Sequence, residues 1–147
     1  MIAEGEMAPD FEGPTSAGSR LKLSELRGHP VILYFYPQAD TPGCTREGKG
    51  FRDHFDELGG KDVRVIGVST DDVEDEAKFA KKYGFQFPLV ADPNGEITGK
   101  YGVKGLTGRA KRVTFLIQPD GRVAKVIASS DASNHVDQAC EFSWPGA

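Results

Sequence analysis

Cys44 is the residue of this sequence that is best placed for chemistry. Thr41-Pro42 is typical of a helix start, because threonine can cap orphan amides and proline fits the first helical position. The first helical turn would then be Pro42, Gly43 and Cys44, where unpaired N–H groups and the helix dipole favour an anion. Gly43 leaves space beside the sulfur for a small substrate. The pattern indicates a nucleophilic thiolate, although a cysteine that only fills space at the helix start also fits this position.

The segments around this cysteine predict a sheet protein with covering helices. Residues 31–36 are apolar throughout, as in a strand buried on both faces, and Pro37 ends the strand because proline cannot donate to a ladder. The turn 119–121 indicates that the last two strands form an antiparallel hairpin. Further strands are predicted at 63–68, 113–117 and 123–127, and helices at 42–58, 72–83 and 133–143. This order predicts a three-layer α/β sandwich, with ligand chemistry beyond the carboxyl ends of the strands, where residues 37–44 lie.

Length, charge and cysteine content narrow the class of protein. The 147 residues predict a single domain, 1–147, that needs no disulfides to be stable. With 18 basic and 22 acidic residues the net charge is −4, which argues against a nucleic-acid partner. No apolar run approaches the ~20 residues of a membrane span, and the N-terminus lacks the features of a signal peptide. Two cysteines are too few for a secreted disulfide scaffold, so we expect a cytoplasmic protein that does not bind membranes.

The sequence around Cys44 resembles the active-site loop of the peroxiredoxins. Residues 36–45 read YPQADTPGCT, which is similar to the peroxiredoxin Q subgroup, also called bacterioferritin comigratory proteins. The resemblance extends over nearly the whole chain. The opening GEMAPDF (5–11), the segment LSELRG (23–28) and the segment RVTFLI (112–117) are similar to other motifs of the family and occur in the same order.

This resemblance implies a three-layer, thioredoxin-like α/β fold with a mixed central sheet and flanking helices. It also implies an antioxidant enzyme, a thiol-dependent peroxidase that reduces hydrogen peroxide and small organic hydroperoxides through a sulfenic acid at Cys44. Such chemistry requires no metal and no organic cofactor. It requires an external thiol reductant, such as a thioredoxin or glutaredoxin system, and the protein would be a monomer or a homodimer.

The resemblance also assigns roles to four residues. Cys44 would be the peroxidatic cysteine, and Thr41 would hold the peroxide through its hydroxyl, unless it only caps the Cys44 amide. Arg112 would place positive charge near the thiolate and the leaving oxygen, unless it is only a solvated member of a basic run. Pro37 would shield the sulfur, unless it simply ends the strand.

The predicted helix departs from the subgroup after Cys44. Many members carry a resolving cysteine five residues later, where this chain has Lys49. Gly48 and Gly50 flank that position, and each interior glycine costs roughly 0.5–1 kcal/mol relative to alanine. The helix is therefore predicted to be locally weak, which would let it unravel around Cys44 unless tertiary packing compensates.

Cys140 is the one other thiol in the chain. The spacing of Val136, Ala139, Cys140 and Ser143 predicts that Cys140 faces inward on the last helix, as a buried and inert cysteine. It is also the candidate resolving cysteine, either within the chain or between chains. His54 and His135 are predicted to be surface or packing residues rather than metal ligands.

Two other functions remain open from the sequence alone. A thioredoxin-like thiol–disulfide oxidoreductase is a weaker prediction than a peroxidase. Cys44 is followed by Thr45-Arg46-Glu47, so it does not belong to a Cys-x-x-Cys motif. The other is a thioredoxin-fold binding module without catalysis. The residues of the peroxidase pattern argue against that module, whereas Lys49 leaves room for it.

Overall fold

A mixed sheet forms the centre of the protein in the computed structural model, which describes residues 1–145. Its five strands have the order β5-β4-β3-β6-β7. The first three are parallel to one another, and β6 and β7 run antiparallel at the far side. The strands are β3 (Val31–Phe35), β4 (Arg64–Ser69), β5 (Leu89–Ala91), β6 (Val113–Ile117) and β7 (Val123–Ile127). This topology confirms the predicted mixed α/β sheet and its terminal hairpin.

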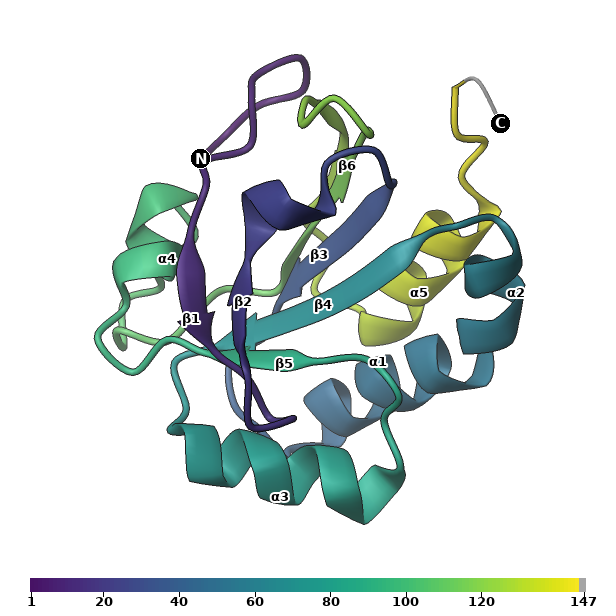
Figure 1. The fold of residues 1–147 in the computed structure, drawn as a ribbon. Helices are drawn as coiled ribbons and strands as arrows, with labels where there is room; N and C mark the ends of the chain where they lie inside the picture. The colour runs from purple at the N-terminus through teal and green to yellow at the C-terminus, as the bar shows by residue number, and fades with distance from the viewer. Residues whose placement is uncertain (146–147) are drawn as a thin grey trace.

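The sheet is covered on both faces, so the molecule has three layers (Figure 1). Strand β3 shows why: its side chains alternate between two apolar clusters, with Leu33 and Phe35 in one and Ile32 and Tyr34 in the other. Each large apolar side chain buried in this way contributes roughly 1.5–3 kcal/mol. Two sets of elements supply the outer layers. One set is β1 (Glu12–Pro14), β2 (Arg20–Lys22), the 3-10 helix η1 (Leu23–Leu26) and α4 (Glu96–Lys100), and the other is α1 (Pro42–Asp53), α2 (Phe55–Gly60), α3 (Val73–Tyr83) and α5 (Ala132–Glu141).

The predicted helix from residue 42 to residue 58 is wrong in one respect: it is two helices. Helix α1 ends at Asp53 and α2 begins at Phe55, with His54 between them at φ −99° and ψ 5°. The His54 ring contributes to this break, because its Nδ1 donates to the Gly50 carbonyl oxygen at 2.9 Å. The turn directs α2 along the sheet, where Leu58 is buried.

Two of the three glycines of α1, Gly48 and Gly50, are positions of close packing. A Cβ on Gly48 would overlap the ring of Phe85, and a Cβ on Gly50 would lie 2.7 Å from a methyl group of Val136. Phe85 is itself stacked on Phe87, with ring centroids 5.3 Å apart, so it has little room to move. The predicted weakness of this helix is therefore offset by contacts that only glycine permits.

Helix α5 places Cys140 as the sequence predicts. The helix is capped by Asp131, whose side chain accepts from the Ser133 amide at 3.0 Å. Cys140 is 8% exposed and belongs to the apolar cluster that also contains Cys44 and Trp144. Within residues 1–145, none of the helices combines the length and the apolar character that crossing a bilayer demands.

We expect Gly48→Ala to destabilise the protein by about 1–3 kcal/mol, because the added methyl group must displace the Phe85 ring. Helix propensity alone predicts the opposite sign, a gain of up to about 1 kcal/mol. Gly59→Ala is the matched control, since a Cβ there meets no atom within 4 Å. Urea unfolding of the three proteins measures the difference. A Gly48→Ala protein as stable as the Gly59→Ala control would contradict the packing described here.

Candidate active site

The candidate site lies where the carboxyl end of β3 meets the first turn of α1. Strand pairing sets its geometry: Val113, the first residue of β6, is opposite Phe35, the last residue of β3. Arg112 therefore lies directly beside the point where the chain leaves the sheet toward Cys44. Thr41 has extended backbone angles, φ −96° and ψ 157°, and α1 begins at the next residue. Cys44 is thus in the first helical turn, as predicted.

A guanidinium group lies against the sulfur of Cys44. The thiol is 1% exposed, and Nη2 of Arg112 lies 3.4 Å from Sγ as a donor. Gly43 makes this approach possible, since a Cβ there would be 2.9 Å from Nη2. The space beside the sulfur that the sequence assigns to a substrate is therefore occupied partly by Arg112. The structure brings these two predicted residues together.

Thr41 and Pro37 occupy the loop between β3 and α1, loop 37–41. Thr41 is at the N-cap position, but its side chain makes no capping hydrogen bond, so the expectation that it caps the Cys44 amide is wrong. Its hydroxyl donates instead to the Gln38 carbonyl oxygen at 2.8 Å. Pro37 is partly buried, and its carbonyl oxygen lies 3.5 Å from Nη1 of Arg109. The catalytic roles of both residues stay predictions.

Glu47 is a site residue that sequence reasoning missed. Its side chain is 0% exposed, and Oε1 accepts a hydrogen bond of 2.6 Å from Nη1 of Arg112. Burial raises the pKa of Glu47 to about 8, although Arg112 acts in the opposite direction. Arg112 is affected in turn: burial opposes its charge, but Glu47 and Cys44, when they are ionised, raise its pKa. The spacing from Cys44 to Glu47, three residues on one helix face, is a signal that could have found it.

His135 lies behind Glu47 and is fully buried. Its Nε2 donates to the Ser129 carbonyl oxygen at 2.6 Å, which leaves Nδ1 to accept from the Thr114 hydroxyl at 2.8 Å. The Oε2 atom of Glu47 is 3.8 Å from Nδ1 and has no hydrogen-bond partner among the described residues. Burial lowers the pKa of His135, with Arg112 adding to the effect. This histidine is a packing residue, as predicted, and it holds α5 against the site.

Besides the contact of Pro37 with Arg109, loop 37–41 is tied to the rest of the fold through Ala39 and Asp40. Asp71 accepts from the Ala39 amide at 2.8 Å. Asp40 has a positive φ of 59° and accepts from Lys82 at 2.8 Å and from the Tyr83 hydroxyl at 2.6 Å. A non-glycine residue with φ in this region costs about 1 kcal/mol or more, and the two contacts from α3 offset that cost.

Lys49, which stands where the subgroup often has a cysteine, also contacts α3. Its Nζ lies 5.2 Å from the centroid of the Tyr83 ring, in a cation–π contact worth roughly 0.5–1 kcal/mol at an exposed site. The same Tyr83 hydroxyl binds Asp40. Lys49 therefore links the middle of α1 to the residue that also anchors loop 37–41.

Cys140 is buried in an environment that disfavours the thiolate form of its side chain. Burial raises the pKa of its thiol to about 11, and the nearby carboxylates of Glu57 and Asp137 add to the effect. Both cysteines are free thiols in the structure. A thiol with this pKa is almost fully protonated at neutral pH, so its nucleophilicity is low.

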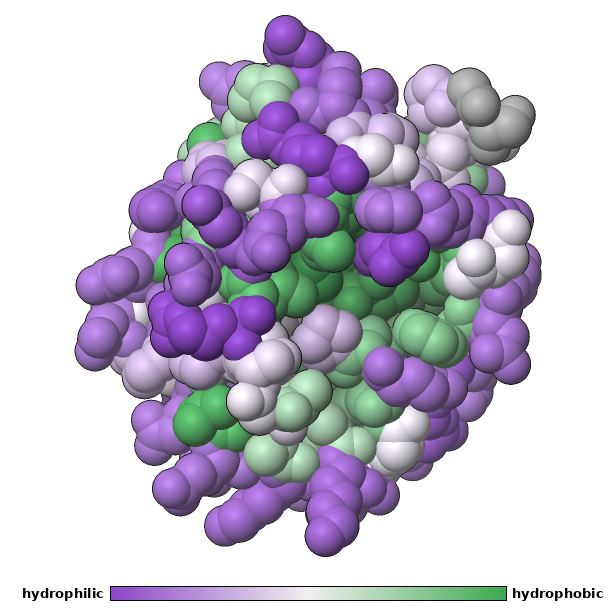
Figure 2. Space-filling model, in the orientation of Figure 1, coloured by the Kyte–Doolittle hydropathy of each residue, from purple (hydrophilic) through white to green (hydrophobic). Residues whose placement is uncertain are grey.

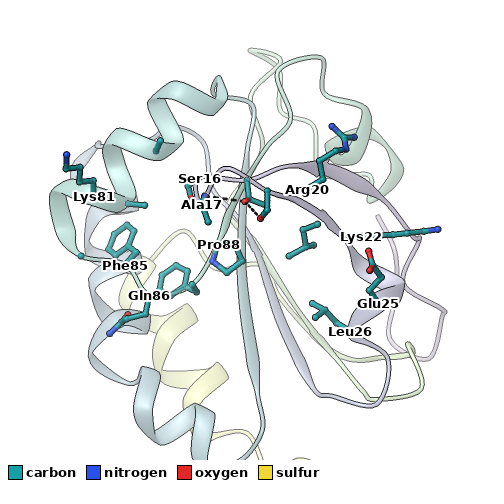
Figure 3. Close-up of a pocket in the computed structure, with 17 residues that line it drawn as sticks. Ser16, Ala17, Arg20, Lys22, Glu25, Leu26, Lys81, Phe85, Gln86 and Pro88 are labelled. Atoms are coloured by element: carbon teal, nitrogen blue, oxygen red, sulfur yellow. Dashed lines mark hydrogen bonds between the residues drawn. The ribbon is translucent and has the colours of Figure 1, made fainter.

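Two clefts of the structure lie away from the cysteines. One, of about 730 Å³, lies between β2 and the second half of α3, and is lined by residues such as Arg20, Lys81 and Phe85 (Figure 3). A second cleft of about 440 Å³ adjoins β4, and apolar side chains line the hollow across this face of the molecule (Figure 2). Neither cleft contains a cysteine. Among residues 1–145, no group of three His, Cys, Asp or Glu side chains is arranged to hold a metal ion.

Comparison with known proteins identifies the family. Residues 5–126 match the AhpC/TSA family. The chain belongs to this family. Peroxiredoxin Bcp of Escherichia coli is 38% identical over 143 residues, 92% of each chain. The crystal structure of peroxidoxin BcpB from Mycobacterium tuberculosis has a TM-score of 0.90 at 40% identity, covering 95% of each chain. Peroxiredoxin Q of Xanthomonas campestris has a TM-score of 0.83 at 31% identity, covering 88% of this chain and 87% of the other.

These similarities confirm the expected family and its thioredoxin-like fold. The chain is a peroxiredoxin of the Bcp, or peroxiredoxin Q, group, and its activity is that of a thiol-dependent peroxidase. The comparisons do not favour a thiol–disulfide oxidoreductase or an inactive binding module. The activity of a peroxiredoxin requires a peroxide as substrate and a thiol as reductant.

The raised pKa of Glu47 makes the stability of this peroxiredoxin depend on pH. The unfolded carboxyl titrates near 4.5 and the folded one near 8, so between these values the unfolded chain releases a proton that the folded protein keeps. The free energy of unfolding therefore falls as pH rises through this window. Between pH 5 and pH 8, the decrease in the free energy of unfolding should be smaller in Glu47→Gln than in the unaltered protein. We expect the difference to be at least about 1.4 kcal/mol, the equivalent of one pKa unit.

Urea unfolding at the two pH values measures this difference. Exposed Glu57 supplies the control variant Glu57→Gln, which should keep the pH dependence of the unaltered protein. Equal pH dependence of the unaltered and Glu47→Gln proteins would show that Glu47 is ionised in the fold.

Proposed function

We propose that this peroxiredoxin reduces hydrogen peroxide and small organic hydroperoxides by direct attack of Cys44 on the peroxide. The observation that carries the proposal is the 3.4 Å contact between Nη2 of Arg112 and Sγ of Cys44, in the first turn of α1. The guanidinium and the helix N-terminus both stabilise negative charge on sulfur, and the thiolate is the nucleophilic form.

The reaction transfers one oxygen atom to sulfur. The Cys44 thiolate attacks one peroxide oxygen, an S–O bond forms and the O–O bond breaks. The leaving alkoxide or hydroxide takes a proton to become an alcohol or water, and Cys44 is left as a sulfenic acid. Arg112 and the first-turn N–H groups of Gly43 and Cys44, which have no intrahelical acceptor, are positioned to stabilise charge on the leaving oxygen.

Thr41 and Pro37 complete the proposed site from loop 37–41. The Thr41 hydroxyl gives its proton to Gln38, so its oxygen lone pairs remain to accept from the O–H of a peroxide. Pro37 carries no donor, and its ring would keep water from the sulfur. These roles rest on the match of the two residues to the family motif and on their place beside Cys44.

The protonation state of Glu47 determines whether the positive charge of Arg112 is available to the sulfur of Cys44. Arg112 faces two acidic groups with a single positive charge. Because the pKa of Glu47 is raised to about 8, this carboxyl keeps its proton near neutral pH. The guanidinium charge is then available to the Cys44 thiolate and to the leaving oxygen, while Glu47 fixes the orientation of the guanidinium.

Reduction of the sulfenic acid is proposed to need an external thiol. Lys49 replaces the local resolving cysteine, and the alternative candidate, Cys140, is a buried thiol whose pKa is about 11. We propose a thioredoxin or glutaredoxin system as the reductant. We also propose a cytoplasmic location, which agrees with such a reductant. The net charge of −4 gives no support for a nucleic-acid partner, no membrane partner is proposed, and the enzyme would work as a monomer or a homodimer.

Replacement of the two cysteines tests the proposal. Cys44→Ser should abolish peroxide consumption in stopped-flow measurements of the reduced protein, whereas Cys140→Ser should react at the unaltered rate. Peptide mapping after one equivalent of peroxide should find sulfenic acid at Cys44, and sulfinic acid with excess peroxide. A Cys44→Ser protein that still consumed peroxide would exclude the proposed chemistry. Rapid formation of a Cys44–Cys140 disulfide would make Cys140 the resolving cysteine.

Arg112→Ala should slow the peroxide reaction by ~10²–10³, the effect of removing one electrostatic donor from a transition state. Arg112→Lys keeps the charge without the paired donors and should fall between the two. Lys111→Ala, at the exposed neighbouring position, is the control for loss of a positive charge and should react normally. Circular dichroism verifies that each variant is folded. A folded Arg112→Ala protein with an unaltered rate would place Arg112 outside the reaction.

A further inference from the structure

A second buried carboxyl group, besides Glu47, lies on α3 close to the residues that hold loop 37–41. Glu76 of α3 is 0% exposed. Its Oε1 accepts from the Tyr36 hydroxyl at 2.6 Å and lies 3.0 Å from Oγ of Ser69. Its Oε2 is buried and has no hydrogen-bond partner among the described residues. The reaction at Cys44 assigns no task to this group.

Glu76 is connected to loop 37–41 through two residues that follow β4. The Ser69 hydroxyl lies 2.7 Å from Oδ2 of Asp71, and the same Oδ2 accepts the Ala39 amide at 2.8 Å. Ala39 is the middle residue of the loop that carries Pro37 and Thr41. Asp71 therefore holds the loop by its backbone, and Ser69 joins Asp71 to Glu76.

The number of hydroxyl protons available to these hydrogen bonds bears on the protonation state of Glu76. Ser69 has one hydroxyl proton but two carboxyl oxygens within hydrogen-bond distance, at 2.7 Å and 3.0 Å. If the proton is donated over the shorter distance to Asp71, the contact with Glu76 requires a proton from Glu76. A protonated Glu76 satisfies every contact, whereas an ionised Glu76 competes with Asp71 for the Ser69 proton.

The surroundings of Glu76 agree with a protonated side chain. Burial raises its pKa to about 8, and the nearby Asp71 and Asp75 add to the effect of burial, although the hydrogen bonds from Tyr36 and Ser69 oppose it. The groups near it from β3 and the residue that follows the strand are the hydroxyls of Tyr34 and Tyr36. The nearest cation along the network is Arg109, which lies 3.9 Å from Oδ1 of Asp71. An ionised Glu76 would thus face hydroxyls and acids.

We propose that Glu76 is a positioning residue for loop 37–41, whose proton lets Ser69 and Asp71 hold the Ala39 amide in place. Loss of this proton puts a second negative charge beside Asp71 and draws the Ser69 hydroxyl away from it, so the loop loosens. Glu76 acts through Ser69 and Asp71 and does not contact the peroxide. The effect on catalysis rests on the proposed function, because it requires that Pro37 and Thr41 bind the peroxide.

Hydrogen exchange of the Ala39 amide tests the positioning without any peroxide. In the reduced protein, the protection factor of this amide by NMR should fall on the order of tenfold between pH 6.5 and pH 9.5, equivalent to one weakened hydrogen bond to a charged group. In Glu76→Gln the protection should stay constant, because a side-chain amide does not ionise and its Nε2 can donate one hydrogen to Ser69 and the other to the Tyr36 oxygen. Glu74→Gln, at an exposed position of the same helix, should behave as the unaltered protein.

The pH dependence of the peroxide reaction provides the second readout. The rate constant should decline above about pH 8 in the unaltered and Glu74→Gln proteins, and the decline should be smaller in Glu76→Gln, where only the ionisation of Glu47 remains in this pH range. Constant protection of Ala39 in the unaltered protein, or an equal fall in Glu76→Gln, would overturn the proposal, as would a decline in rate that is as large in Glu76→Gln as in the unaltered protein. If Ala39 behaves as expected but no protein consumes peroxide, the positioning stands and the proposed function is wrong.

Discussion

The contact on which the site depends is the partly buried guanidinium of Arg112 between the sulfur of Cys44 and the carboxyl of Glu47. A positive charge in this position has little water to solvate it, so its hydrogen-bond partners must be provided by the protein. Glu47 provides one and Cys44 the other. Gly43 is required for the approach, and the pairing of Val113 with Phe35 brings Arg112 to it. The register of β3 and β6, the start of α1 and the glycine at position 43 together make this contact possible.

Burial raises the pKa of two carboxyl groups near the site, Glu47 and Glu76, to about 8. An acid that keeps its proton can donate as well as accept, which a carboxylate cannot do. In the roles proposed above, the proton on Glu47 leaves the charge of Arg112 free for sulfur, and the proton on Glu76 completes the hydrogen-bond chain through Ser69 and Asp71 to loop 37–41. Both proposed roles depend on the neutral form of the acid.

The departure from the subgroup at Lys49 has a structural consequence beyond the loss of a cysteine. Lys49 lies over the Tyr83 ring, and Tyr83 also binds Asp40, so α1, α3 and loop 37–41 are linked at one aromatic residue. Gly48 and Gly50 on either side are closely packed against Phe85 and Val136. In this protein the helix after Cys44 is therefore better anchored than its glycine content suggests.

The sequence by itself determined the strand that begins at residue 31, the terminal hairpin and the place of Cys44 in a first helical turn, because these depend on a continuous apolar run, on turn residues and on a proline at the first helical position. Its motifs also pointed to the correct family. Only the tertiary structure decided that Arg112 meets Glu47 and that Asp71 holds the Ala39 amide. It also showed that His54 divides a helix. The first two contacts join residues tens of positions apart, and their distances are set by strand register and by the packing of α1 and α3 on the sheet. Local patterns carry no record of that register, and burial, which raises the pKa of Glu47 and Glu76, arises only when the layers close.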